Sequence, residues 1–167
     1  MIRAIVTFGY VGLLRPAPGT WGSLAAVVLA VLAYQAGFAL AVPLGCVVVT
    51  VLGFWAVPRA IAGQADKDPS EIVIDEVAGQ WLALSFTLLP LWWHDAGLLA
   101  AWPGVVVPFV LFRLFDIWKP WLVGRADRRG DGAGVMLDDL WAGLFAGVCS
   151  VVLAGLYHAV LQPMTGG

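Results

Sequence analysis

Long apolar runs set the strongest limit on how this chain can fold. The sequence contains five of them: Ser23–Gly37, Ala39–Ala62, Val77–Trp93, Gly97–Phe115 and Leu140–Leu161. All but the first have the length of about 17–25 residues with which a helix crosses a bilayer. Composition agrees, because 61% of the 167 residues are hydrophobic and the mean hydropathy is +0.90, too high for an ordinary soluble domain. The sequence therefore predicts an all-α, polytopic membrane bundle of about five hydrophobic helices.

Charged residues are confined almost entirely to three short segments. Eighteen of the twenty lie in Met1–Gly22, Gly63–Glu76 or Arg113–Asp139, and Arg59 closely precedes the second segment. Two predicted crossings separate successive segments, so all three should emerge on one face of the membrane. All nine Lys and Arg then lie on that face, which the positive-inside rule makes cytoplasmic. We expect the catalytic loops there and the tail after Leu161 on the opposite side.

The first apolar run is shorter than the others. Ser23–Gly37 would span only about 22 Å as a helix, so it is either a short crossing or a re-entrant element. A re-entrant run would break the one-sided distribution of charge unless Ala39–Ala62 also failed to cross, which favours a true hairpin. No linker or low-complexity tract divides the chain, so we expect one domain over residues 1–167. Cys46 and Cys149 lie inside apolar runs and are expected to be buried small hydrophobes.

Two acidic doublets stand where apolar runs begin. Asp75-Glu76 precedes Gly79 and Asp138-Asp139 precedes Gly143, and a glycine at that place allows two helices to approach closely. One interpretation is that the first carboxylate of each doublet caps its helix, which leaves the second one unexplained. The other is that all four carboxylates form a Mg²⁺ site, because Mg²⁺ prefers a few carboxylates together with water and phosphate oxygens.

The third charged segment mixes bases with carboxylates at the expected depth of the lipid headgroups. Arg113, Asp116 and Lys119 follow one another at intervals of three, so one helical face can carry all of them, and Asp127-Arg128 comes shortly after. Membrane anchoring would explain an isolated Arg or Lys. The mixture fits the binding of a metal-bound phosphate better, since Arg supplies a bidentate fork and Lys a point charge.

Six motifs in this order resemble a known family, phosphatidylglycerophosphatase A, over nearly the whole chain: Thr7-Phe8-Gly9, Pro18-Gly19-Thr20-Trp21-Gly22-Ser23, Ile74–Gly79, Phe112–Trp121, Asp127-Arg128 and Gly134–Asp139. The resemblance implies a Mg²⁺-dependent phosphatase of the bacterial cytoplasmic (inner) membrane. Such an enzyme hydrolyses phosphatidylglycerophosphate to phosphatidylglycerol and inorganic phosphate. Its partners would be the phospholipid substrate and the membrane, with no nucleic acid. One departure is Asp131-Gly132, where the family usually has Gly-Gly, so we assign no function to Asp131.

The candidate site consists of three sets of residues. The metal set is Asp75, Glu76, Asp138 and Asp139; the phosphate-binding set is Thr20, Arg113, Lys119 and Arg128; the catalytic set is Arg113, Asp116, Lys119 and Asp127. Either Asp116 or Asp127 would orient the attacking water or protonate the leaving oxygen. The sequence leaves open an aspartyl-phosphate intermediate, the number of metal ions and the oligomeric state.

Two other functions compete with this one. A lipid phosphotransferase that uses a CDP-alcohol would need Asp-Gly-x-x-Ala-Arg ahead of spaced aspartates, whereas Asp131-Gly132 runs into Ala-Gly-Val-Met. A small ion or solute transporter usually places ionisable residues near the middle of the bilayer, and the five apolar runs contain almost none.

Overall fold

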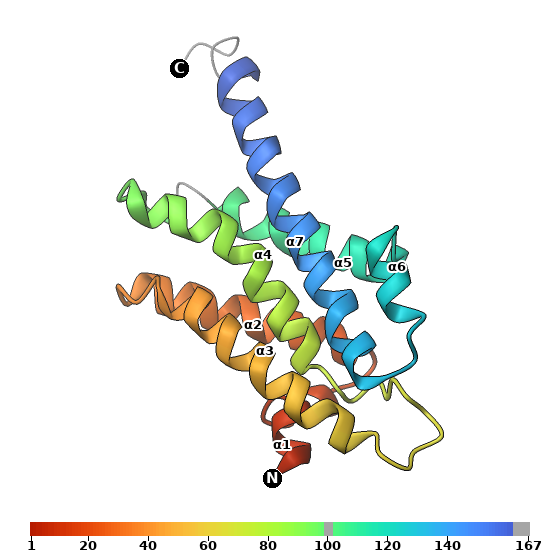
Figure 1. The fold of residues 1–167 in the computed structure, drawn as a ribbon. Coiled ribbons are helices and arrows are strands. Elements are labelled where there is room, and N and C mark those ends of the chain that lie inside the picture. The colour runs from red at the N-terminus through yellow and green to blue at the C-terminus, as the bar shows by residue number, and fades with distance from the viewer. Residues whose placement is uncertain (99–101, 162–167) are drawn as a thin grey trace.

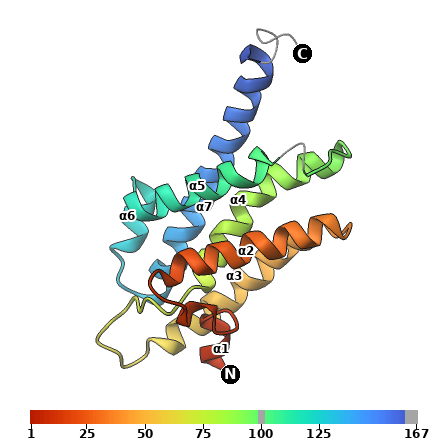
Figure 2. The same ribbon diagram turned by 180° about the vertical axis from the view of Figure 1, so that it is seen from behind.

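The computed structural model describes residues 1–98 and 102–161, and within these ranges the chain is helical with no strand. The prediction of an all-α fold is therefore confirmed. Figures 1 and 2 show the elements in chain order: α1 (Ile2–Val6), the 3-10 turn η1 (Val11–Leu13), α2 (Pro18–Gln35), α3 (Ala41–Ala60), α4 (Ile74–Trp93), α5 (Pro103–Trp118), α6 (Leu122–Asp127), α7 (Gly132–Leu156) and the π-helical turn η2 (Tyr157–Leu161). The predicted position of the tail after Leu161 falls outside the described residues.

Three of the described helices are long and apolar enough to cross a membrane: Pro18–Gln35, Ala41–Ala60 and Gly132–Ala159. Their outer faces expose large hydrophobic side chains, such as Leu32 on α2, Val47 on α3 and Val152 on α7. Helix α2 begins five residues before the predicted start at Ser23, because Pro18 occupies a first-turn position that suits proline. Its 18 residues correspond to about 27 Å, close to the thickness of a bilayer core.

Helix α4 is the centre of the bundle. It packs against α2, α3, α5 and α7, and these contacts bury apolar side chains from its first turn to Leu88, among them Val77 and Leu84. Trp81 points to the α2–α3 side, where its indole N–H donates to the carbonyl of Ala26 (2.8 Å). Helix α4 therefore holds the elements on both sides of it in fixed positions.

Two glycines allow α4 and α7 to cross closely. A Cβ on Gly143 would lie 2.2 Å from the carbonyl oxygen of Gly79, and a Cβ on Gly79 would lie 2.4 Å from the carbonyl oxygen of Asp139. Neither position can hold a side chain unless the helices separate. The crossing lies about one turn beyond each acidic doublet and so brings the two doublets side by side.

The polar parts of the chain gather at one end of the bundle. This end, on the right and lower right of Figure 1, contains the first turns of α2, α4 and α7, the last turns of α3 and α5, helix α6 and the connection of residues 61–73. The other ends of α2, α3 and α4 lie together on the left of the same view.

Candidate active site

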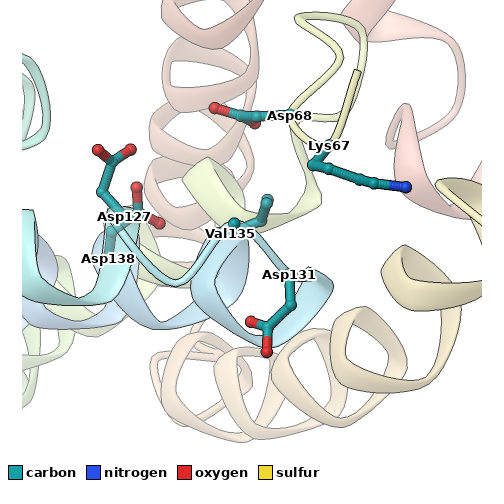
Figure 3. A pocket seen from close by; sticks show the side chains of 7 residues that line it. Lys67, Asp68, Asp127, Asp131, Val135 and Asp138 are labelled. Atoms are coloured by element: carbon teal, nitrogen blue, oxygen red, sulfur yellow. The ribbon is translucent and has the colours of Figure 1, made fainter. Parts of the chain in front are cut away.

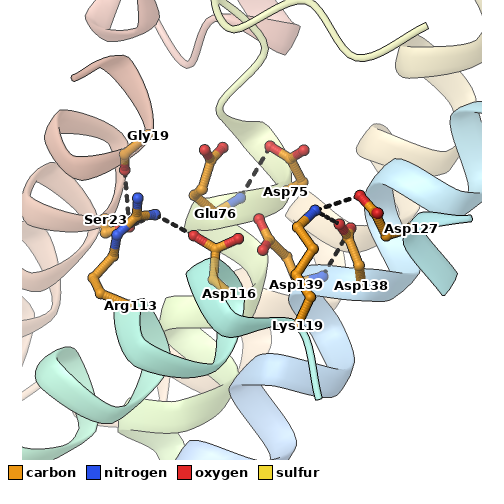
Figure 4. Close-up of polar contacts among 10 residues, drawn as sticks. All are labelled: Gly19, Ser23, Asp75, Glu76, Arg113, Asp116, Lys119, Asp127, Asp138 and Asp139. Carbon is orange, nitrogen blue, oxygen red and sulfur yellow. Dashed lines mark hydrogen bonds and ion pairs between the residues drawn. The ribbon is translucent and has the colours of Figure 1, made fainter. Parts of the chain in front are cut away.

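Three carboxylates form a compact group between α4 and α7 (Figure 4). Asp75 and Glu76 lie in the first turn of α4 and Asp139 lies in the second turn of α7, and oxygens of the three side chains are all within 4.8 Å of one another. Asp75 is 5% exposed and Asp139 3%. Glu76 Oε2 and Asp139 Oδ1 are buried and have no hydrogen-bond partner in the described part of the chain. Close, buried carboxylates repel one another, and their hard oxygens could hold a divalent cation.

Helix capping does not explain the doublets. The N-cap of α4 is Val73, which makes no side-chain cap, and the N-cap of α7 is Asp131, whose carboxylate accepts from the backbone N–H of Gly134 (2.7 Å). Helix α7 thus begins at Gly132, so Asp138 and Asp139 lie well inside it. The capping interpretation is therefore wrong for Asp138, and the residue that caps α7 is Asp131.

Arg113 forms a second part of the site, next to the carboxylate group. Its guanidinium pairs with Asp116 (2.7 Å) one turn along α5 and donates to Ser23 Oγ (3.4 Å) on α2. Figure 4 shows Asp116 between Arg113 and Asp139. Helix α2 approaches this point closely, because a Cβ on Gly19 would lie 2.1 Å from Glu76 Oε1. The Pro-Gly-Thr motif therefore places its glycine directly against the carboxylate group.

Lys119 forms the third part of the site. It ends α5 in the left-handed conformation (φ 51°), and its ammonium contacts Asp127 Oδ1 at 2.5 Å and Asp138 Oδ2 at 2.7 Å. Burial opposes the charged form, but the hydrogen bonds to Asp127 and Asp138 outweigh it and raise the pKa of Lys119. Lys119 is therefore a fixed cation at the site, and Asp138 is bonded to it.

The structure brings most but not all of the predicted residues together. Asp75, Glu76 and Asp139 form one group, and Arg113–Asp116 and Lys119–Asp127–Asp138 adjoin it. Arg128 is exposed at the end of α6 and makes no ion pair in the described residues. Thr20 lies in the first turn of α2, where the described residues give its hydroxyl no hydrogen bond.

Asp68 belongs to the same region and was not predicted. With Asp127 and Asp138 it lines a small cavity of about 30 Å³, and Figure 3 shows its carboxylate turned to the side on which these two lie. Asp68 is exposed as a residue, but partial burial of its carboxylate raises its pKa, and the nearby Lys119 opposes the rise. It lies in an irregular connection, where no periodicity could reveal which way it points.

Gln80 is the second residue that the sequence did not reveal. Its side chain is completely buried on α4, and neither its amide nitrogen nor its oxygen has a hydrogen-bond partner within the described residues. Gln80 follows Glu76 by four residues, so the two lie on one face of α4. A glutamine inside an apolar run is a detectable signal, because burying an unpaired amide is unfavourable.

Helices with apolar outer faces are typical of a membrane-associated protein, and the carboxylates and cations at one end of them could bind a metal ion and a phosphate group. Comparisons with known proteins agree. The family model for phosphatidylglycerophosphatase A matches residues 4–154. The chain is 32% identical over 136 residues to phosphatidylglycerophosphatase A of Haemophilus influenzae (81% of this chain, 77% of the relative) and 34% identical over 140 residues to that of Escherichia coli K12 (81% and 73%).

A third relative, from Bacteroides thetaiotaomicron, bears a provisional name as a phosphatidylinositol-3-phosphatase. It is 35% identical over 134 residues (78% of this chain, 79% of the relative). No solved structure matches the chain. The chain belongs to the phosphatidylglycerophosphatase A family and is a phosphatase, so the resemblance found in the motifs is confirmed.

Proposed function

We propose that this protein hydrolyses the terminal phosphate monoester of phosphatidylglycerophosphate in a Mg²⁺-dependent reaction, giving phosphatidylglycerol and inorganic phosphate. The observation that carries the proposal is the group of Asp75, Glu76 and Asp139 beside two fixed cations at the polar end of apolar helices. A lipid in the adjoining leaflet would present its headgroup at this depth. Family membership supports the same reaction.

Asp75, Glu76 and Asp139 would hold the metal ion. The set fits Mg²⁺, because it offers only carboxylate oxygens and because two of these oxygens are buried without a hydrogen-bond donor in the described residues. Bound Mg²⁺ would neutralise phosphate charge and activate oxygen ligands. Asp138, which was predicted as a fourth ligand, instead serves in this proposal to hold Lys119 in place.

The two cations would bind the phosphate directly, and one of the remaining carboxylates would transfer a proton. Arg113, fixed by Asp116 and Ser23, is placed to bind phosphate oxygens, and Lys119, fixed by Asp127 and Asp138, adds a point charge. Asp127 is the better candidate for proton transfer, because its side chain is 40% exposed and lines the small cavity, whereas that of Asp116 is 15% exposed. Asp127 would give a proton to the leaving oxygen or take one from water.

The membrane arrangement is part of the proposal. We propose that α4 and α5 cross the bilayer together with α2, α3 and α7, in one domain over residues 1–167 and with the site facing the cytoplasm of a bacterial inner membrane. The one-sided distribution of Lys and Arg supports this orientation. The carboxylates in the first turn of α4 and the second turn of α7 would then lie at the headgroup level.

Phosphate release by the purified protein tests the reaction and the headgroup. The substrates are phosphatidylglycerophosphate and phosphatidylinositol 3-phosphate with matched acyl chains, and CDP-diacylglycerol with glycerol 3-phosphate tests for phosphotransfer instead. We expect release from phosphatidylglycerophosphate to be at least about tenfold faster than from the inositol lipid, a difference of about 1.4 kcal/mol. Preference for the inositol lipid would contradict the proposed substrate, and headgroup transfer without hydrolysis would contradict the proposed reaction.

Matched amide variants test the site in the same assay. Asp139→Asn should abolish most phosphate release, because it removes one charged oxygen from the central group. Asp95→Asn is the control, since Asp95 lies after α4 at the opposite end of the bundle, in a left-handed conformation (φ 51°) that asparagine also adopts. Equal activity of the two variants would place the reaction outside this group.

A further inference from the structure

A second concave site lies at the polar end of the bundle, between α1, the last turn of α3 and the connection of residues 61–73. Its volume is about 290 Å³, near the lower end of the range of about 300–1,000 Å³ found for small-molecule pockets. Ile2, Val6 and Ile72 form an apolar wall, and Arg3, Arg59 and Gln64 provide polar groups. None of the candidate active-site residues lines it. We call it the α1–α3 groove.

The two arginines keep donor groups available for a ligand. Within the described residues, the Arg3 side chain makes one ion pair, with Glu71 (3.1 Å), and the side chains of this pair are 65% and 38% exposed. Such exposed pairs are weak and exchange readily. Arg59 donates one N–H to the carbonyl of Trp55 and lies with its guanidinium 4.8 Å from the centroid of the Trp55 ring. Since a guanidinium has five N–H donors, both residues can bind further oxygens.

The groove opens beside a surface suited to an acyl chain. Helix α3 is one of the candidate membrane spans, and in the two turns before Arg59 it exposes Val51, Phe54 and Trp55. A tryptophan at this place is typical of the membrane interface. A lipid lying along α3 would therefore bring its headgroup to the level of the α1–α3 groove.

The net charge of the groove lining favours anionic over zwitterionic lipids. Two guanidinium groups face one carboxylate, so the lining has an excess of positive charge. A zwitterionic choline headgroup has no net charge, whereas an anionic headgroup brings a net negative charge to the arginines. We propose that the α1–α3 groove binds the headgroup phosphate of an anionic phospholipid from the surrounding leaflet, with Arg3 and Arg59 as its cationic contacts. This site is separate from the one at which the substrate would be hydrolysed.

Lipid retention measured by native mass spectrometry tests this proposal. The purified protein is equilibrated with equal amounts of phosphatidylserine and phosphatidylcholine of the same acyl chains. Phosphatidylserine is chosen because it is not a product of the proposed reaction. We expect the wild type to retain phosphatidylserine with a preference of about tenfold, given the attraction of basic residues for anionic lipid. If the wild type prefers phosphatidylserine over phosphatidylcholine by less than about twofold, which is within the spread expected for surface effects, this result alone overturns the proposal.

Variants test whether Arg3 and Arg59 cause the preference for phosphatidylserine. Arg3→Gln combined with Arg59→Gln should reduce it to about twofold or less, and Arg125→Gln should leave it intact, because Arg125 is exposed on α6 and does not line the groove. An unchanged preference in the double variant, or an equal loss in Arg125→Gln, overturns the proposal. Inorganic phosphate at the same concentration should not displace the lipid. Complete displacement would indicate a site for a free anion and would also overturn it.

Discussion

At the scale of single residues, the proposed site depends on cations that are fixed in place. A membrane anchor needs only a positive charge on a long apolar stem, whereas a phosphate ligand needs a particular donor geometry. Arg113 and Lys119 are both held by carboxylates, at 2.7 Å from Asp116 and 2.7 Å from Asp138. Their positions therefore fit phosphate binding better than anchoring.

We predict that Arg113→Lys and Lys119→Arg each lower phosphatase turnover by more than about tenfold, or about 1.4 kcal/mol of transition-state stabilisation. Yield and membrane insertion should not change, since each swap keeps the charge. Phosphate release and membrane-fraction immunoblots measure these quantities. Arg125→Lys is the control and should stay within about a factor of two. If all three swaps behave alike, the two cations are anchors.

Substitution of Gln80 should affect stability and activity differently. Gln80→Met keeps the length of the side chain and removes an amide that is buried and unpaired in the described residues, so melting temperature in detergent should stay equal or rise. Turnover should fall by about tenfold or more if the amide orients the neighbouring site, as supporting residues around metal ligands do. Melting curves and phosphate release are measured together. Unchanged turnover in Gln80→Met would show that Gln80 has no part in the site. If Gln80→Glu keeps turnover close to wild type and Gln80→Met does not, a role for Gln80 in the site is supported.

The limits of sequence analysis are clearest at individual residues. Asp75, Glu76 and Asp139 could be grouped from sequence, because each doublet precedes a glycine by a few residues in an apolar run. The partnership of Asp138 with Lys119 could not, since it depends on the left-handed end of α5. Arg128 was predicted to bind phosphate; it is exposed at the end of the short helix α6, and its role stays a prediction.

At the scale of helices, the close crossing of α4 and α7 holds the site together. The sequence predicted small residues at this crossing, and the structure confirms it with Gly79 and Gly143 in backbone contact. The helix boundaries were harder to predict. Helix α7 starts eight residues before the predicted apolar run at Leu140, because Asp131 caps it and residues 132–139, including the acidic doublet, are helical.

Gly143→Ala tests this crossing. The added methyl group would meet the Gly79 carbonyl oxygen at 2.2 Å, so the helices must separate, at a destabilisation of about 1–3 kcal/mol. Melting temperature and turnover should both fall. Gly155→Ala on the same helix is the matched control, because no atom lies within 4 Å of its added Cβ, and it should be neutral or slightly stabilising. Similar behaviour of the two variants would show that α4 and α7 do not need this contact.

At the scale of the whole molecule, the proposed topology places the site and all the basic residues on one side of the membrane. Labelling of single cysteines with a membrane-impermeant thiol reagent tests this in a variant that lacks Cys46 and Cys149. Ser70→Cys and Arg129→Cys should react only after the cytoplasmic side is opened, whereas Asp95→Cys should react from outside. All three positions lie in exposed connections. Reaction of Ser70→Cys and Asp95→Cys from the same side would contradict a crossing by α4.

The central claim is that Asp75, Glu76 and Asp139 hold Mg²⁺ for a lipid phosphatase. The most direct measurement is phosphate release from phosphatidylglycerophosphate by the purified protein, first in excess chelator and then after Mg²⁺ is restored. We expect release to stop in chelator, to return with Mg²⁺, and not to return in Asp139→Asn at the same concentration. Full turnover in excess chelator would contradict the proposed metal site, because the three carboxylates would then have no metal to hold during catalysis.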